Sequence, residues 1–382
     1  MIEKLVHVSR RSHNVSGVNF IHGDNYIDII RDKGDESDEI AASSIFYDIT
    51  NVRAKFIKIS FECFCDFNYF SNMFTIGFDK IKKGTYKQSD IDVFKKNGEV
   101  LDSQRFSVEI SSSYKRRNII YIPVDDNDGC LKFIISTSKL YGSSNRKSKL
   151  SIFNLKIDEV ELLGDDLEGT INSYELSKMT IISPELKWSG RFSDNKVNVV
   201  FSSVNVPIWK YQLNHILDSC MSSSLYINDS QSQWYQDGLQ TLGGNKFHLI
   251  MVLNLFINKI DCGNINFIGL SMGAFGALEY GKYCRVNQVY AFNPDSILLE
   301  PGSRSVSFIK GNKYSSIDLI DLINGNNIVY LYFSKLDTYD RKTYQRVVDE
   351  NLANACVKYL DSGHNIGSLF EEESFLLDII KN

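Results

Sequence analysis

The sequence predicts an α/β protein in which a parallel sheet covered by helices follows an antiparallel, jelly-roll-like β-sandwich. Two observations lead to this prediction. The hydrophobic pattern changes near residue 163, from short strands without helices to strands that alternate with helices. The chain has 382 residues, 43% of them hydrophobic, which is enough for two domains with separate cores. We expect a β-sandwich over residues 1–165 and an α/β domain over residues 181–382, joined by the polar residues 164–180.

The N-terminal half is rich in strand-forming residues. Its β-rich runs are separated by Ser, Asn, Gly and Asp, several of them alternate between apolar and polar residues, and the only proline in this half is Pro123. The runs cover residues 19–30, 54–64, 73–78, 105–110, 118–124, 131–137 and 150–162. Short strands with turn signals between them predict an antiparallel sandwich or jelly roll. The likeness to carbohydrate-binding jelly rolls concerns this pattern only and is an analogy of fold.

The C-terminal half alternates apolar strands with helical segments. The expected strands are residues 196–204, 223–230, 264–271, 286–294, 327–335 and 356–364, and residues 185–192 are a candidate for an earlier strand. The expected helical segments are residues 246–260, 273–284, 315–323 and 343–355. Near-continuous apolar strands with helical crossovers predict a parallel sheet that is buried on both faces. In such sheets, functional residues collect just beyond the carboxyl ends of the strands.

Composition and charge exclude some classes of protein. A net charge of −5 and a pI near 5.8 argue against a nucleic-acid binder and against binding to anionic membranes. The seven cysteines follow no repeating spacing, so we expect no disulfide framework and a reducing compartment. The N-terminal residues lack the apolar core of a signal peptide, and the longest apolar stretch, residues 249–257, is too short to span a bilayer. We therefore expect a cytoplasmic protein with no transmembrane segment.

No metal site is expected from the sequence. Cys63 and Cys65 alternate as strand residues do, and no Cys or His pair lies nearby to complete a metal site. The acidic stretch Asp125–Gly129 lacks the spacing of an EF-hand loop, and its Asp-Gly pair favours a turn.

One serine stands between two glycines where an expected strand meets an expected helix, in Gly269-Leu270-Ser271-Met272-Gly273. This is the pattern of a nucleophile elbow, a turn so tight that its neighbours must lack bulky side chains while the serine is pushed above the sheet. A pentapeptide of this kind also arises by chance. Whether Ser271 is a nucleophile therefore depends on whether the chain also supplies an oxyanion hole, a base and an acid. The start of the helix offers backbone N–H groups for an oxyanion hole, and Met272 would supply one. The second should come from the loop at the end of the expected strand 196–204, near Ser202, Ser203 or Val204, and we choose Ser203.

A serine hydroxyl needs a base to take its proton during attack, and imidazole is suited to this task. Of the six histidines, only His364 follows the elbow, in a small polar turn just past the last expected strand. The acid that orients it should follow the preceding strand, and we choose Asp337. Asp340 is expected to begin the next helix, where a carboxylate stabilises the N-terminus. Asp295, one strand earlier, is the rival acid.

Residues 181–382 resemble the α/β-hydrolases, and more narrowly one bacterial branch of them. That branch contains capsule polysialic-acid O-acetyltransferases and the accessory-Sec component that acetylates sugars on serine-rich surface glycoproteins. The resemblance rests on GLSMGAFGALEYGKY (269–283), on INDSQSQWYQDG (227–238) and on the loops that carry Asp337 and His364. Trp234 and Tyr235 either stack on a sugar ring or pack over the sheet edge, and they are the candidate substrate-binding residues.

The resemblance implies an O-acetyltransferase that moves an acetyl group from acetyl-CoA through Ser271 to a sugar hydroxyl of a capsular or surface polysaccharide. Acetyl-CoA would be a substrate, and no bound cofactor is expected. Two alternatives remain. One is a serine esterase or deacetylase with the same Ser-Asp-His triad, in which water replaces the sugar. The other is a non-catalytic partner in a surface-glycan or secretion pathway. The sequence does not identify the glycan or the oligomeric state, and the protein could form a homo-oligomer.

Overall fold

The structure, a computed structural model, describes most of the chain. The described residues are 7–13, 18–31, 44–65, 74–85, 99–107, 113–137, 148–191, 196–219, 222–260, 263–309 and 314–366. The chain divides into two compact units, Met1–Leu162 and Leu163–Asn382. Residues 164–180, which the sequence suggested as a join, therefore belong to the second unit.

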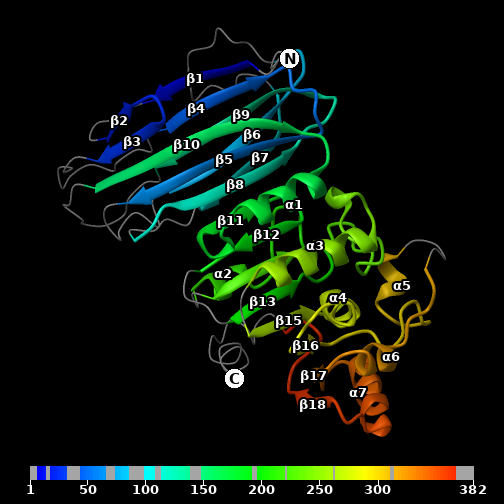
Figure 1. The fold of residues 1–382 in the computed structure, drawn as a ribbon. Coiled ribbons are helices and arrows are strands. Elements are labelled where there is room, and N and C mark those ends of the chain that lie inside the picture. The colour runs from blue at the N-terminus through cyan, green and yellow to red at the C-terminus, as the bar shows by residue number, and fades with distance from the viewer. Residues whose placement is uncertain are drawn as a thin grey trace, which may run out of the picture. The chain divides into compact units, whose positions relative to one another are not determined.

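The first unit contains two antiparallel sheets, whose strands follow the orders β1-β4-β9-β6-β7 and β8-β5-β10-β3-β2 among the described residues (Figure 1). The strands are β1 (His7–His13), β2 (Val18–His22), β3 (Tyr26–Arg31), β4 (Ser44–Thr50), β5 (Phe56–Cys65), β6 (Phe74–Lys82), β7 (Val100–Ser107), β8 (Arg116–Pro123), β9 (Asp128–Thr137) and β10 (Ser148–Val160). Alternate residues of β5 are buried, as expected of a strand with one face in a sandwich core. Strands β1 and β4 were not among the β-rich runs expected from the sequence; the sequence of β1, HVSRRSH, has no alternating apolar residues.

The acidic stretch at residues 125–129 forms a turn, with the Asp128 N–H donating to the Asp125 carbonyl at 2.9 Å. The turn leads from β8 to β9, which lie in different sheets, and is therefore not a hairpin. The Lys80 ammonium lies 3.3 Å from the carboxylates of both Asp125 and Asp128.

The second unit contains a mixed sheet in the order β11-β12-β14-β13-β15-β16-β17-β18. Strand β12 runs antiparallel to β11 and β14, and from β14 onward neighbouring strands are parallel. The strands are β11 (Met179–Ile182), β12 (Leu186–Ser189), β13 (Lys196–Phe201), β14 (Ser223–Ile227), β15 (Asn264–Leu270), β16 (Gln288–Phe292), β17 (Ile328–Ser334) and β18 (Ala355–Leu360). This is the strand arrangement of the α/β-hydrolase fold. The predicted fold class is confirmed.

Helices connect these strands. They are α1 (Leu163–Ser173), α2 (Asn214–Ser219), α3 (Lys246–Lys259), α4 (Met272–Gly281), α5 (Ser305–Phe308), α6 (Leu319–Asn324) and α7 (Thr338–Glu350), with short 3₁₀ turns η1 (Leu176–Lys178) and η2 (Gln240–Leu242). Helix α3 begins where the Asn245 side chain caps it. Helix α7 begins five residues before the predicted segment 343–355, because Asp337 caps it.

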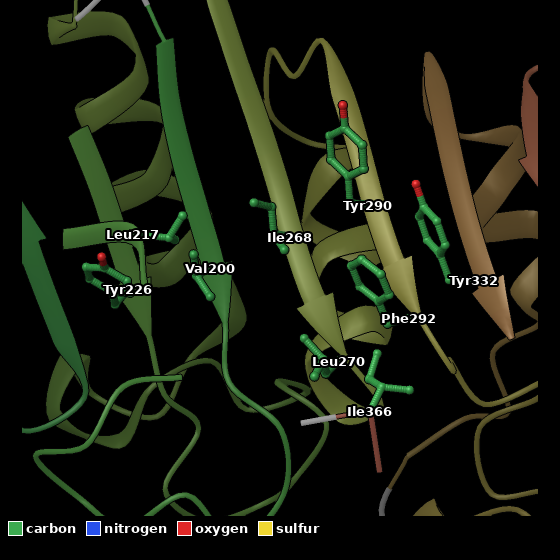
Figure 2. Close-up of a cluster of buried hydrophobic side chains, with 9 residues drawn as sticks. All are labelled: Val200, Leu217, Tyr226, Ile268, Leu270, Tyr290, Phe292, Tyr332 and Ile366. Atoms are coloured by element: carbon green, nitrogen blue, oxygen red, sulfur yellow. The ribbon is translucent and has the colours of Figure 1, made fainter. Parts of the chain in front are cut away.

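Both faces of the central strands β13, β14, β15 and β16 are buried, and successive residues of each strand alternate between the faces, whereas the edge strand β18 has no buried residue. On one face Val200, Ile268, Tyr290 and Phe292 belong to a cluster with Leu217 of α2 (Figure 2). On the other face the ring of Phe201 contacts those of Phe267, Tyr235 and Tyr280. Since the two faces are filled, the carboxyl ends of the strands are where functional side chains can emerge.

Candidate active site

Ser271 lies in the sharp turn between β15 and α4. Its φ of 53° and ψ of −113° place a non-glycine residue in a strained region of backbone conformation. The Ser271 N–H donates to the Phe292 carbonyl at 2.7 Å, which ties the turn to the end of β16. The residue is 8% exposed. These are the features of a nucleophile elbow.

Two glycines make this turn sterically feasible. A Cβ on Gly269 would lie 2.0 Å from the carbonyl oxygen of Gly273, and a Cβ on Gly273 would lie 2.1 Å from the carbonyl oxygen of Phe201. Both clashes are with backbone, which cannot turn aside as a side chain can. The glycines that flank Ser271 are therefore required by the close approach of α4 to β15 and β13.

The imidazole of His364 lies between Ser271 and a buried carboxylate. Its Nε2 is 3.0 Å from the Ser271 Oγ, and its Nδ1 is 2.9 Å and 3.1 Å from the two carboxylate oxygens of Asp340. An ionised carboxylate can only accept hydrogen bonds, so Nδ1 carries the proton and Nε2 is left to accept from the serine. The His364 side chain is 21% exposed and that of Asp340 is 1% exposed. The arrangement can deprotonate Ser271 during attack.

The structure pairs His364 with Asp340, so the expected contact with Asp337 is wrong. The Asp337 carboxylate caps α7, accepting from the N–H groups of Tyr339 at 2.9 Å and Asp340 at 3.0 Å. Asp337 therefore has the helix-starting role that the sequence analysis assigned to Asp340. Asp340 lies in the first turn of α7, and its carboxylate faces His364. The rival Asp295 is also occupied elsewhere, since it accepts from the N–H groups of Arg304 and Ser305.

Residues that the sequence analysis did not consider hold the His364 loop. The Asn293 side chain donates to the His364 carbonyl at 2.9 Å, and the Ser334 hydroxyl donates to the Gly363 carbonyl at 2.7 Å. Asn293 and Ser334 also bond to each other, at 2.8 Å between the side chains. Ile366 is 1% exposed and packs into the cluster around the ends of β15 and β16 (Figure 2). These contacts fix the main chain on both sides of the imidazole.

The two expected oxyanion donors are placed differently. Met272 is the first residue of α4, so its N–H has no acceptor within the helix, and no hydrogen bond of this N–H is found to any described residue. The Ser203 N–H, in contrast, donates to the side-chain oxygen of Gln212 at 2.7 Å. Ser203 lies close to the elbow, because the Phe201 and Ser202 carbonyls abut Gly273. Gln212 must move before Ser203 can bind an oxyanion.

Trp234 and Tyr235 are both fully buried, so of the two alternatives the structure favours packing, and the choice of these residues as substrate-binding is wrong. The Trp234 ring lies 5.8 Å from that of Phe308, and the Tyr235 hydroxyl donates to the Ser202 carbonyl at 2.8 Å. Their loop is organised by Asp229, whose carboxylate accepts from three backbone N–H groups. Burial raises the pKa of Asp229 to about 6, although those hydrogen bonds act to lower it.

Among the described residues, no group of three or more His, Cys, Asp or Glu side chains is placed to hold a metal ion. Within the same residues no helix has the length and apolar character needed to cross a bilayer.

No protein-family model and no curated protein matches this chain. Similar solved structures include the glycosylation-associated protein (Gap123) complex of Streptococcus agalactiae, which is 13% identical over 98% of this chain and 74% of that chain, with a TM-score of 0.41. A capsule O-acetyltransferase of Neisseria meningitidis serogroup A is 17% identical over 52% of this chain and 90% of its own, also with a TM-score of 0.41. An α/β serine hydrolase without lid from Xanthomonas campestris is 9% identical over 50% of this chain and 86% of its own, with a TM-score of 0.34. A capsule O-acetyltransferase is thus among the similar structures, as the sequence resemblance led us to expect.

Proposed function

We propose that this protein is a serine acyltransferase that forms an acyl-enzyme on Ser271. One observation carries the proposal: Ser271 Oγ, His364 and Asp340 form a continuous hydrogen-bonded chain at a strained elbow. A serine in this setting is activated by the adjacent base, and a buried carboxylate stabilises the imidazolium that forms. A structural role would not require the strained conformation of Ser271.

The reaction would proceed in two halves. Ser271 Oγ attacks the acyl carbonyl while His364 Nε2 takes its proton, and the imidazolium then returns the proton to the departing group. In the second half an acceptor hydroxyl attacks the acyl-enzyme, gives its proton to Nε2 and leaves as an ester, and the proton returns to Ser271. Asp340 keeps the Nδ1 proton in place throughout. The Met272 N–H and, once Gln212 has moved, the Ser203 N–H would stabilise the oxyanion.

The proposed donor is acetyl-CoA and the proposed acceptor is a sugar hydroxyl of a capsular or surface polysaccharide. The support is the sequence resemblance of residues 227–238 and 269–283 to glycan O-acetyltransferases. Acetyl-CoA is made in the cytoplasm, so the proposal puts the reaction there. Binding of the polysaccharide cannot be assigned to Trp234 and Tyr235, which are buried.

The experiment is to incubate the protein with acetyl-CoA and measure acetylation of Ser271 by mass spectrometry and release of free CoA. We expect an added capsule-type polysaccharide to accelerate CoA release and to carry acetyl esters afterwards. Rapid hydrolysis of simple acetyl esters, with CoA release unaffected by every polysaccharide tried, would instead identify an esterase.

A further inference from the structure

An arginine and a second carboxylate adjoin the acid of the hydrogen-bonded chain. The Arg304 Nη2 lies 2.8 Å from the Oδ2 of Asp337 and 3.7 Å from the Oδ1 of Asp340. The side chains of Arg304 and Asp337 are 28% and 25% exposed, whereas that of Asp340 is 1% exposed. Arg304 thus lies between two carboxylates, one of which is the partner of His364.

The main chain fixes both ends of this ion pair. The Arg304 N–H donates to Asp295 at 3.3 Å, and the next residue, Ser305, donates to the same carboxylate at 2.9 Å. Asp337 is held by capping α7. Burial acts to raise the pKa of Asp337, but the N–H of Asp340 and the Arg304 guanidinium outweigh it, and that pKa lies below its usual value. Asp337 is therefore negatively charged at neutral pH.

We propose that Arg304 is a positioning residue that acts through Asp340, offsetting the two carboxylates and so setting the pH at which His364 gains its proton. A nearby positive charge disfavours the imidazolium, and each nearby carboxylate favours it. Asp337 pairs with Arg304 and partly neutralises its positive charge, which weakens the effect of Arg304 on His364. The inference rests on the proposed function, since acyl transfer through Ser271 requires His364 to be neutral at the start.

Among the residues that the structure describes, the other charged groups near the His364 loop do not replace Arg304. Lys335 pairs with Asp361 at 2.7 Å, and the Asp361 side chain is 84% exposed, so solvent screens the pair. Asp295, which lies under Arg304, has its pKa raised by burial and is occupied by two main-chain N–H groups. Arg341 is exposed and donates to the Thr338 hydroxyl at 3.3 Å.

The test removes the positive charge of Arg304 in one variant and the negative charge of Asp337 in another, which should shift the pH profile in opposite directions. Arg304→Gln should move the acidic limb of the rate profile to higher pH by about one pH unit, because His364 then faces two uncompensated carboxylates. Asp337→Asn should move it to lower pH by a similar or smaller amount, and asparagine still caps α7. The double variant should return close to the wild-type profile. Arg304→Lys keeps the positive charge and should leave the acidic limb of the rate profile at the wild-type pH. Arg341→Gln is the matched control, because it removes an exposed positive charge and should leave the limb unchanged.

Two readouts separate this inference from the proposed function. One is the pH dependence of the acylation burst with a small acetyl ester, and the other is NMR titration of the labelled His364 ring, identified by its absence in His364→Asn. If the wild type never acylates Ser271, the proposed function fails, while the NMR titration still tests the charge effect. If the wild type acylates but the two single variants move both readouts in the same direction, or by less than the Arg341→Gln control, Arg304 does not have this role.

Discussion

The elbow around Ser271 meets the start of α7, which carries Asp340, and the loop that carries His364 at the same edge of one sheet. The two sides are assembled over different distances along the chain. At the elbow, Ser271 and the two required glycines lie within five consecutive residues. On the other side, Asp340 and His364 are 24 residues apart, and His364 is 93 residues from Ser271. The His364 loop is held by side chains from the ends of β16 and β17 and by the buried Ile366.

This difference explains why Ser271 could be identified from the sequence and Asp340 could not. A turn with a fixed backbone shape demands particular residues at neighbouring positions, and those residues are visible in the sequence. Which carboxylate contacts the imidazole depends, in contrast, on how the helix that carries it packs against the His364 loop. Asp337 and Asp340 differ by three positions, and only the start of α7 decides which of them faces His364.

The largest effect is expected for Ser271→Ala. The fold should persist, because the hydroxyl contacts His364 rather than the core, while acyl transfer should fall on the order of 10⁵-fold. The measurements are the acylation burst with an acetyl ester and a thermal melt. A variant that retains more than about a tenth of the wild-type rate would end the proposal of a serine nucleophile.

The acid side should show a steep contrast between neighbours. Asp340→Asn should lower the rate on the order of 10³- to 10⁴-fold, because the imidazole loses the partner that fixes its tautomer. Asp337→Asn should stay within about tenfold of the wild type at its optimum pH, since asparagine keeps the helix cap. The measurement is the steady-state rate of both variants as a function of pH, compared with that of the wild type. Equal losses at the optimum pH would mean that Asp337 is needed as much as Asp340 and would undo the assignment of Asp340 as the acid that orients His364.

Glycines on the two sides offer a matched pair for stability. Gly273→Ala should destabilise the protein by about 2–3 kcal/mol and impair acylation, because the new methyl group would meet the Phe201 carbonyl. Gly363→Ala, next to His364, should change stability by less than about 1 kcal/mol, since no described residue other than its chain neighbours lies within 4 Å of the added Cβ. Denaturant unfolding measures both. A tolerated Gly273→Ala would show that the elbow can be built without the close approach described above.

The smallest effect is expected at Gln212. Its side-chain oxygen accepts from the Ser203 N–H, and that bond must break before the same N–H can serve an oxyanion. A hydrogen bond of this kind is worth about 0.5–1.5 kcal/mol, so Gln212→Ala should speed acylation about two- to tenfold. The burst rate with an acetyl ester measures it. A slower variant would show that Gln212 holds the loop in place and does not compete with the substrate.

The sequence by itself determined the strands from β13 onward, the helices α3, α4, α6 and α7 between them, and the elbow at Ser271. The period of apolar residues and the demands of a tight turn act over a few neighbouring positions, so both are visible in the sequence. Helix α1 and strand β11 lie where the sequence suggested a polar join, and were not predicted. It also singled out His364, the one histidine beyond the elbow, as the candidate base. Only the tertiary structure decided that Asp340 faces His364, that Trp234 and Tyr235 are core residues, and that Arg304 lies between two carboxylates. Each of these depends on contacts between segments far apart in the chain. Local propensity acts between neighbours, so it cannot say which of two nearby carboxylates, or which face of a loop, will meet a partner that arrives from another strand.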